Sequence, residues 1–553
     1  MTIIKRIDAW ARREWILLTL LALTFALRIV GIGYGLPLTV VSDEQPFTLG
    51  ALQMLNTKTL VPSFNEEAFS VLYYPPYMSY VLLLPFVAII GVQWFIWQGS
   101  AALFTSYLLS DLTAFFVVAR FINIILSVIS VYLLFRTAEA LFKSRIAAVA
   151  ASLLLATSIL HEALSMVGRH WLPVSFFFIL VLFVLTRTNI SLSRRYLYSF
   201  LVAGVAMGFS SISALAVGLI GLYYLLFDAQ RLQKILHDLP RLSLYGVLFA
   251  ILAIIPSLLH SKSNGFIVAL TLFGQKTLED FLASPWATLS LTIYSEPVLT
   301  GLFIFGLFLA LLYSRRILIL IGGFFLLYIA VFYVFFRLEP RFLVPLLPLY
   351  ALAAGYCVEC LWNKKTVALV CVVLLLPLVS AVRFSYLVYE GDTRDAARTW
   401  LLKHLKPEDK VLIHVSGLRL PATPTALEEL RAIDPGAIRR TDEAEAALRL
   451  QNVPHALNLV GAADTAFIED LPAYASSHGY THLVFARESM LPSVMPLFSR
   501  LAEGSDELQH YEGFGSWMSS YESAFLRSFL ELLENRMLGP DIVIYRLPPK
   551  TSP

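Results

Sequence analysis

Residues 366–386 read TVALVCVVLLLPLVSAVRFSY, and Arg383 is the only charged residue among them. An apolar run of about 20 residues is long enough to cross the hydrocarbon core of a bilayer as a helix. From Glu390 onward the sequence continues as EGDTRDAARTW and becomes rich in charged residues. The stretch therefore predicts a last membrane span followed by a water-soluble region.

The composition of the whole chain points the same way. Hydrophobic residues make up 58% of the 553 residues, charged residues 15%, and the mean hydropathy is +0.71. These values lie outside the range of soluble proteins. We expect a mostly α-helical membrane bundle with about eleven spans, because apolar runs of spanning length recur at 15–33, 112–135, 146–165, 171–187, 242–259, 297–313, 317–336 and 342–361.

Two further apolar stretches, 76–97 and 198–226, admit two topologies. If 76–97 crosses the membrane, six basic residues fall on its outer side, against the tendency of Lys and Arg to stay in the cytoplasm: Arg136, Lys143, Arg145, Arg187, Arg194 and Arg195. If 76–97 instead is juxtamembrane or re-entrant, these residues become cytoplasmic, and 198–226 must turn back on itself between Gly204 and Ser213. We favour the second topology, with outer loops at 34–111 and 260–296.

Charge is divided unevenly along the chain. Residues 390–553 carry a net charge of −7, and the preceding residues carry +10. A basic membrane section suits cytoplasmic loops beside anionic membrane lipids, and the pattern excludes a nucleic-acid partner. Basic residues precede the first span without a cleavage site after it, which predicts an uncleaved helix with a cytoplasmic N-terminus. We expect a multi-pass protein of the plasma (inner) membrane whose C-terminus lies outside.

The chain is expected to form two domains, residues 1–389 in the membrane and residues 390–553 as an extracytoplasmic α/β domain. In the second part strand-like and helical segments alternate, at 411–415, 424–432, 441–451, 482–486 and 541–547. All three cysteines of the chain lie in apolar runs before residue 390, so this domain must fold without a disulfide.

An acidic pair, Asp43 and Glu44, follows the first span in the sequence VSDEQPFTLGALQM and opens an amphipathic helix. The structural interpretation is capping, in which Ser42 or Asp43 accepts hydrogen bonds from the first turn and Glu44 complements the helix dipole. The functional interpretation is catalysis, in which one carboxylate acts as a general base on an acceptor hydroxyl and the other orients it or binds a cation. The residues alone leave both open.

Cationic side chains lie at the predicted outer ends of spans, where they could stabilise a departing phosphate. Those at span ends are Arg169, His170, Arg337 and Arg341, with Glu339 between the last two, and those within spans are Arg28 and Arg120. A charge at depth in a membrane is costly and usually functional, although an arginine that snorkels to the interface is the structural alternative.

The order of these features resembles the GT-C superfamily of membrane glycosyltransferases, in particular the branch of the protein O-mannosyltransferases and the lipid A aminoarabinose transferase. The motifs that carry the resemblance are, in order, ALRIVGIGYG, the pair Asp43 and Glu44, YYPPYMSYVLLLPF, Arg120, GRHWLPVSFFF, RFLVPLLPLYALAAG at 341–355 and DTRDAARTWL at 392–401. Together they cover most of the chain.

The resemblance implies that a polyprenyl-phosphate sugar donor is used at the non-cytoplasmic face, with inversion, and that the acceptor is a lipid, a glycan or a protein. It makes Asp43 the catalytic base, Glu44 its neighbour and Arg341 a phosphate contact. Arg337, Arg169, His170 and Arg120 are further candidates for the donor phosphate, and Tyr74 and Glu339 for the substrate cavity. Tyr74 stands where many relatives have Lys or His, which leaves a divalent cation as a possible cofactor only.

Other function classes stay open. A transporter or flippase of lipid-linked substrates would also use many spans and intramembrane arginines, but no inverted repeat is visible in the sequence. A glycan ligase or polymerase would share the lipid-linked donor. A non-catalytic membrane scaffold would need neither the acidic pair nor the arginines.

Overall fold

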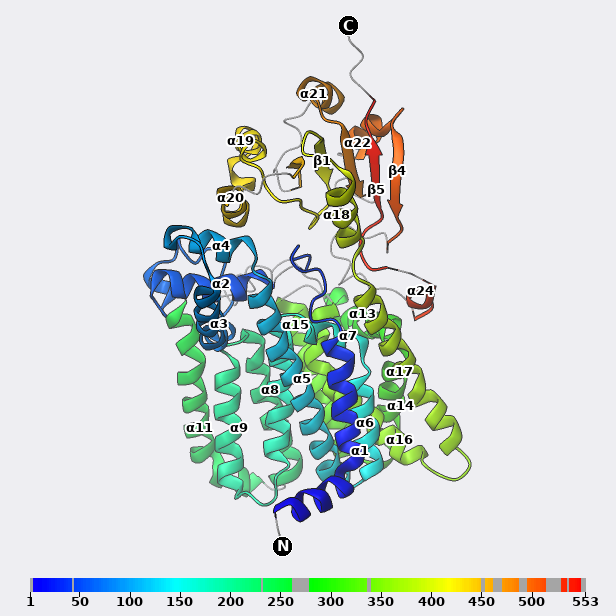
Figure 1. Ribbon diagram of the computed structural model, residues 1–553. Coiled ribbons are helices and arrows are strands. Elements are labelled where there is room, and N and C mark those ends of the chain that lie inside the picture. The colour runs from blue at the N-terminus through cyan, green and yellow to red at the C-terminus, as the bar shows by residue number, and fades with distance from the viewer. Residues whose placement is uncertain are drawn as a thin grey trace.

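The computed structural model describes residues 3–41, 44–229, 232–260, 278–335, 340–448, 453–460, 470–486, 495–513, 529–534 and 537–548. A bundle of long helices fills one end of the molecule, and a small sheet with flanking helices lies at the other (Figure 1). The N-terminal helix starts at the end of the bundle that lies away from the sheet. The predicted fold class, a helical membrane bundle with an α/β part near the C-terminus, is confirmed.

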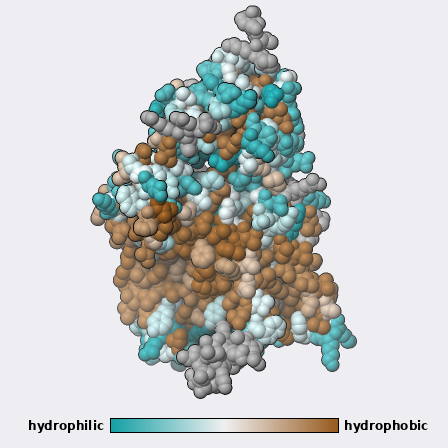
Figure 2. Space-filling model, viewed as in Figure 1, coloured by the Kyte–Doolittle hydropathy of each residue, from teal (hydrophilic) through white to brown (hydrophobic). Residues whose placement is uncertain are grey.

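The long helices of the bundle carry apolar side chains on their outer faces. They are α1 (Ile3–Ile29), α5 (Thr113–Phe142), α6 (Arg145–Ala156), α8 (Trp171–Leu185), α9 (Leu192–Ala206), α10 (Leu215–Tyr223), α11 (Leu232–Leu259), α13 (Leu278–Ser295), α14 (Pro297–Tyr313), α15 (Arg315–Phe335), α16 (Leu347–Leu361) and α17 (Val367–Glu390). On the face that Figure 2 shows, a broad hydrophobic band covers the bundle, with hydrophilic residues above and below it. Only a bilayer tolerates so large an apolar surface, and the chain is a multi-pass membrane protein.

The number of spans stays a prediction. Among the described residues, seven helices are long and apolar enough to cross a membrane, or eight if one bent pair counts as a single span. That pair is α6 and the short helix α7 (Ile159–Ser165), which meet at 58°. The sequence predicts one straight span over 146–165. The break arises where the Ser158 hydroxyl accepts the His161 N–H and caps a new helix.

The turn predicted within 198–226 is present. Helix α9 ends at Ala206 and α10 begins at Leu215, and Arg195 near the start of α9 pairs with Asp228 at 3.3 Å, just beyond the end of α10. The two helices are therefore antiparallel. At the same end of the bundle, Glu14 of α1 pairs with Arg136 and Arg145. The basic residues of these turns thus lie on the side of the N-terminus, as the favoured topology predicts.

The first outer loop, predicted over 34–111, holds three helices: α2 (Gln45–Thr57), α3 (Tyr77–Ile96) and α4 (Phe104–Ser110). Figure 1 places α3 beside α2, near the end of the bundle that faces the sheet. The Tyr77 N–H donates to the Gly208 carbonyl at 3.0 Å, so α3 starts against the turn between α9 and α10. Because α3 is also one of the seven helices long and apolar enough to cross a membrane, its juxtamembrane placement stays a prediction. The second predicted outer loop, 260–296, consists largely of α13 in its described part.

Beyond Glu390 the chain forms a five-stranded sheet in the order β2-β1-β3-β5-β4. Strands β1 (Lys410–His414), β2 (His455–Asn458) and β3 (His482–Ala486) are parallel, and β4 (Asp506–Tyr511) and β5 (Ile542–Arg546) are antiparallel to their neighbours. Helices α18 (Thr393–His404), α19 (Pro424–Ile433), α20 (Arg440–Ala447), α21 (Leu471–His478) and α22 (Met495–Ala502) flank the sheet, whereas α24 (Phe529–Glu534) lies against α17. We call residues 392–548 the C-terminal α/β region.

Three of these strands are the ones predicted from the sequence, and two were missed. Strand β2 has only four residues, HALN, and β4 at the sheet edge reads DELQHY, which is too polar for strand-like alternation.

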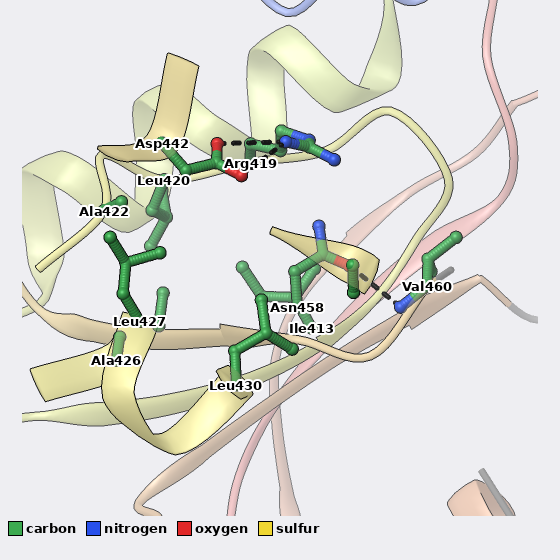
Figure 3. Close-up of a pocket in the computed structure, with 12 residues that line it drawn as sticks. Ile413, Arg419, Leu420, Ala422, Ala426, Leu427, Leu430, Asp442, Asn458 and Val460 are labelled. Carbon is green, nitrogen blue, oxygen red and sulfur yellow. Dashed lines mark hydrogen bonds and ion pairs between the residues drawn. The ribbon is translucent and has the colours of Figure 1, made fainter. Parts of the chain in front are cut away.

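A small pocket lies beside β1 and β2 and is lined by residues of α19 and α20 (Figure 3). An ion pair between Arg419 and Asp442 closes one side of it, with atoms 3.0 Å apart.

Close helix packing in the bundle depends on glycine. At Gly306 of α14, an added Cβ would lie 2.1 Å from the Ala353 carbonyl oxygen of α16. At Gly301, on the same helix, an added Cβ would meet no atom within 4 Å. Small residues that let backbones approach are the usual basis of helix association in lipid.

We therefore expect Gly306→Ala to destabilise the bundle by about 1–3 kcal/mol, the usual cost of overpacking. Thermal unfolding of the detergent-solubilised protein measures the effect. Gly301→Ala is the matched control, and it should leave the melting temperature unchanged or slightly higher. Equal melting temperatures for the two variants would contradict the α14–α16 contact.

Candidate functional site

Glu44 and Arg120 form a buried ion pair at the sheet-facing end of the bundle. Arg120 of α5 donates from Nε to Glu44 Oε1 at 2.8 Å and from Nη2 to Oε2 at 2.7 Å. Its Nη1 donates to the carbonyls of Ile32 and Tyr34, at 3.0 and 2.8 Å. Both charged side chains are almost fully buried. A bidentate pair with further acceptors is the geometry that offsets the cost of burying two charges.

The same carboxylate holds the loop between α7 and α8. Glu44 Oε1 accepts the Gly168 N–H at 2.7 Å. Asn123, one turn after Arg120 on α5, donates from Nδ2 to the carbonyls of Val167 and Arg169, at 2.5 and 2.8 Å. A side chain at residue 168 would not fit, because an added Cβ would lie 2.8 Å from Ala119 Cβ. The loop that carries Arg169 is therefore fixed by two residues of α5 and by Glu44.

His170 ends this loop within a group of aromatic rings. Its ring centroid lies 4.5 Å from that of Tyr74, 5.3 Å from that of Phe47 in α2 and 4.4 Å from that of Trp171. Tyr74 also stacks on Phe47 at 5.0 Å. Tyr74, predicted as a cavity residue, thus contacts His170, predicted as a phosphate residue.

Arg341 adjoins the same row of rings from another helix. It lies in the 3-10 helix η7 (Pro340–Leu346), with its guanidinium carbon 5.3 Å from the centroid of the Phe342 ring. Phe342 packs on Trp171 at 4.8 Å between centroids, and its carbonyl accepts the buried Tyr328 hydroxyl at 2.6 Å. One aromatic row, from Tyr74 through His170 and Trp171 to Phe342, therefore connects the first outer loop with Arg341.

The structure brings Glu44, Arg120, Arg169 and His170 together and places Tyr74 and Arg341 at the edge of this group. Asp43, Arg337 and Glu339 lie outside the described residues. Arg28 lies apart: it donates to the Ala156 carbonyl at 2.9 Å, and its Nη2 lies 3.0 Å from His161 Nδ1. Among the described residues, Arg28 thus contacts the break between α6 and α7.

The contacts of Glu44 and Arg120 bear on their predicted roles. Glu44 makes no side-chain capping bond to α2, and the two residues predicted to cap this helix, Ser42 and Asp43, lie outside the described residues. Both of its carboxylate oxygens accept hydrogen bonds from Arg120, and one also accepts the Gly168 N–H, so Glu44 orients the loop. Its part in catalysis stays a prediction. Arg120 is fully buried, and its Nε, Nη1 and Nη2 atoms donate hydrogen bonds to protein acceptors. A contact between Arg120 and a donor phosphate stays a prediction.

Sequence reasoning missed Asn123, Gly168 and Tyr34. A signal existed only for Asn123, a polar residue one helical turn from Arg120 in an otherwise apolar segment, where helix geometry puts both on one face. Within the described residues, no three His, Cys, Asp or Glu side chains gather in a way that could hold a metal ion. Asp43 and Glu339 lie outside that search, so a divalent cation stays a prediction.

Part of the chain matches a known protein family. Residues 90–260, which include Arg120 and the Gly168–His170 loop, match the family described as dolichyl-phosphate-mannose-protein mannosyltransferase. No curated protein matches the chain. The match confirms the resemblance, predicted from the motifs, to GT-C membrane glycosyltransferases.

Solved structures with a similar course of the chain include ArnT from Cupriavidus metallidurans, in the apo state and bound to undecaprenyl phosphate. These two are 12% and 13% identical, with TM-scores of 0.49 and 0.46; the alignments cover 97% and 98% of this chain and 98% and 99% of those. Another is the Archaeoglobus fulgidus oligosaccharyltransferase in complex with zinc and sulfate, at 13% identity and a TM-score of 0.43, over 88% of this chain and 71% of that one.

We expect Glu44→Gln to destabilise the protein by roughly 3–5 kcal/mol, since it leaves the buried Arg120 without a counter-charge. Thermal unfolding in detergent measures this. Glu67→Gln is the control, because Glu67 belongs to the same outer loop and is exposed. Adding Arg120→Met to Glu44→Gln should restore part of the loss, because it removes the unpaired cation. A Glu44→Gln protein as stable as the control would contradict the ion pair.

Proposed function

We propose that this membrane protein, which resembles the GT-C glycosyltransferases, is an inverting glycosyltransferase that takes its sugar from a polyprenyl-phosphate carrier. The acceptor is a lipid, a glycan or a protein of the cell envelope. The reaction takes place at the outer face of the plasma membrane, on the side where the C-terminal α/β region lies. The region at 390–553 is an extracytoplasmic domain in this proposal.

One observation carries the proposal: the Gly168 N–H bonds to Glu44 at 2.7 Å. Asp43 directly precedes Glu44 and Arg169 directly follows Gly168, and successive Cα atoms are only about 3.8 Å apart. The loop that carries Arg169 and His170 is therefore bound to Glu44, and in this proposal the neighbouring Asp43 acts beside the same cations. A carboxylate beside cations is what transfer from a lipid phosphate needs.

Each side chain has a defined task in this reaction. The Asp43 carboxylate removes the proton from the acceptor hydroxyl as its oxygen attacks the anomeric carbon of the sugar. The bond from that carbon to the phosphate oxygen breaks on the opposite face, which inverts the configuration. Arg169, His170 and Arg341 stabilise the phosphate dianion that leaves. Glu44 and Arg120 hold the loop that carries Asp43.

In this proposal the bilayer orients the lipid-linked donor. The cationic group lies at the sheet-facing end of the bundle, where a lipid phosphate at the membrane interface can reach it while the polyprenyl chain stays among the apolar outer faces of the helices. Family relatives over residues 90–260 are described as acting on a dolichyl-phosphate sugar, which supports a donor of this class.

Asp43→Asn should lower transfer by roughly 10²–10⁴-fold, because the amide keeps the size of the side chain but cannot accept the proton. Turnover is measured with the purified protein and a panel of polyprenyl-phosphate sugars. Glu67→Gln, in the same loop, should retain wild-type turnover. Normal product formation by Asp43→Asn would overturn the assignment, and so would turnover of none of these donors by the wild type.

Arg341→Ala should raise the KM for the donor by about tenfold to a hundredfold, the loss expected for one charge-assisted contact to phosphate. Arg341→Lys, which keeps the charge, should show a smaller increase. Arg194→Ala is the control, since Arg194 is exposed at the opposite end of the bundle. An unchanged donor KM and unchanged binding of the lipid phosphate in Arg341→Ala would remove Arg341 from the site.

A further inference from the structure

Tyr34 is held at both ends in the segment between α1 and α2. Its carbonyl accepts a hydrogen bond from Arg120 Nη1 at 2.8 Å, the same guanidinium that binds Glu44. Its side-chain hydroxyl donates to Asp392 Oδ2 at 2.6 Å, and Asp392 is the residue that caps helix α18. One residue therefore links the Glu44–Arg120 pair to the start of the C-terminal α/β region, 358 positions later in the chain.

Asp392 belongs to a second buried ion pair. Arg394 donates from Nε to Asp392 Oδ1 at 2.7 Å and from Nη2 to Oδ2 at 2.9 Å. The remaining Nη1 donates to the Ser416 carbonyl at 3.0 Å, in the loop after β1. Tyr34, Asp392 and Arg394 are all buried. Burial alone would raise the pKa of Asp392, but Arg394 and the Tyr34 hydroxyl outweigh it and hold the pKa below its ordinary value.

The loop after β1 contacts the segment before Asp43 directly. At Gly417, an added Cβ would lie 3.5 Å from Val40 Cγ1 and 3.0 Å from Arg394 Nη1. The φ of Gly417 is +82°, a conformation that other residues rarely adopt. The loop at 416–417 thus packs both on the cation of the second ion pair and on the chain that leads into the acidic pair.

We infer that the C-terminal α/β region positions the acid-bearing loop through the connection Glu44–Arg120–Tyr34–Asp392–Arg394, and that Tyr34 is a positioning residue for the transfer reaction. This inference rests on the proposed function. It assigns the region a task inside the catalytic cycle of the same chain, beyond simple attachment to the membrane part.

The Tyr34–Asp392 contact differs from the contacts that only attach the C-terminal α/β region to the membrane part. The C-terminal α/β region has other contacts with the membrane part: α20 packs against α4, and Arg383 of α17 donates to the Leu532 carbonyl of α24 at 3.2 Å. These contacts hold the region without touching the acidic pair. The Tyr34 carbonyl and the Glu44 carboxylate both accept hydrogen bonds from Arg120, and the Tyr34 hydroxyl donates to Asp392. Loss of this hydroxyl therefore acts first on the loop that carries the acidic pair.

Tyr34→Phe tests the inference with little risk to folding. Asp392 keeps both hydrogen bonds from Arg394 when the hydroxyl is lost, so the second ion pair survives. We expect kcat to fall roughly tenfold to a hundredfold, since a displacement of about 1 Å at a reacting group has effects of that size. The KM for the donor should change by less than about twofold, because Arg169, His170 and Arg341 are untouched. Backbone amides of residues 30–41 should exchange with deuterium roughly tenfold faster.

Tyr245→Phe is the matched control. It removes a tyrosine hydroxyl bonded to Ser193 at the same distance, 2.6 Å, at the end of the bundle away from the sheet. Transfer and exchange at residues 30–41 should match the wild type. Gly417→Ala disturbs the same connection from the side of the C-terminal α/β region and should reproduce the loss of kcat and the faster exchange, which keeps the test decisive if one variant folds poorly.

Two results would overturn the inference. One is wild-type kcat and wild-type exchange in both Tyr34→Phe and Gly417→Ala. The other is a loss of transfer only in proportion to the fraction of unfolded protein. Failure of the proposed function has a different signature: the wild type transfers no sugar, whereas the exchange measurement still reports whether Tyr34 fixes the loop.

Discussion

The ion pair between Glu44 and Arg120 is the interaction on which the candidate site depends. In a membrane protein an arginine at this depth costs several kcal/mol unless its donors are satisfied. Here Nε and both Nη atoms of Arg120 reach oxygen acceptors, one carboxylate and two carbonyls. The carboxylate oxygen that accepts from Nε also accepts the N–H of Gly168. The first outer loop, α5 and the loop before α8 are thereby fixed relative to one another by one charge pair.

The bundle beneath the site is held by a different force. Lipid chains are as apolar as leucine, so helices in a membrane associate through close packing and interhelical hydrogen bonds. Helix α16 lies against α14 at Gly306 and against α6 at Gly355, where an added Cβ would lie 2.6 Å from the Ala147 carbonyl. Such backbone contacts make a rigid base. The polar and aromatic contacts at its sheet-facing end can then keep a defined geometry although they come from loops.

Sequence predicts the features of this protein that depend on neighbouring residues and misses those that depend on contacts between distant residues. The length of apolar runs and the side of the basic residues are local properties, and they predicted the bundle, the turn between α9 and α10 and the fold class. Arg120 and Glu44 were each found, one by its depth and one by its place after the first span. Their pairing was not, because 76 residues separate them and only the packing of α5 against the first outer loop joins them. The same holds for Tyr34, whose partner Asp392 comes from the other end of the chain.

The segment between α1 and α2 explains why contacts from so far away matter. Its described part, residues 30–41, contains neither a helix nor a strand, and fixing each residue costs about 1–2 kcal/mol of conformational entropy. The hydrogen bonds from Arg120 to the carbonyls of Ile32 and Tyr34 offset part of that cost. Both fix the backbone only, so the Tyr34 side chain needs a contact of its own. Asp392 does this from a position where Arg394 shields it from water and neutralises its charge. If the acidic pair acts as proposed, its geometry is therefore set by two ion pairs in series, and the Ser416 carbonyl of the C-terminal α/β region holds the cation of the second pair.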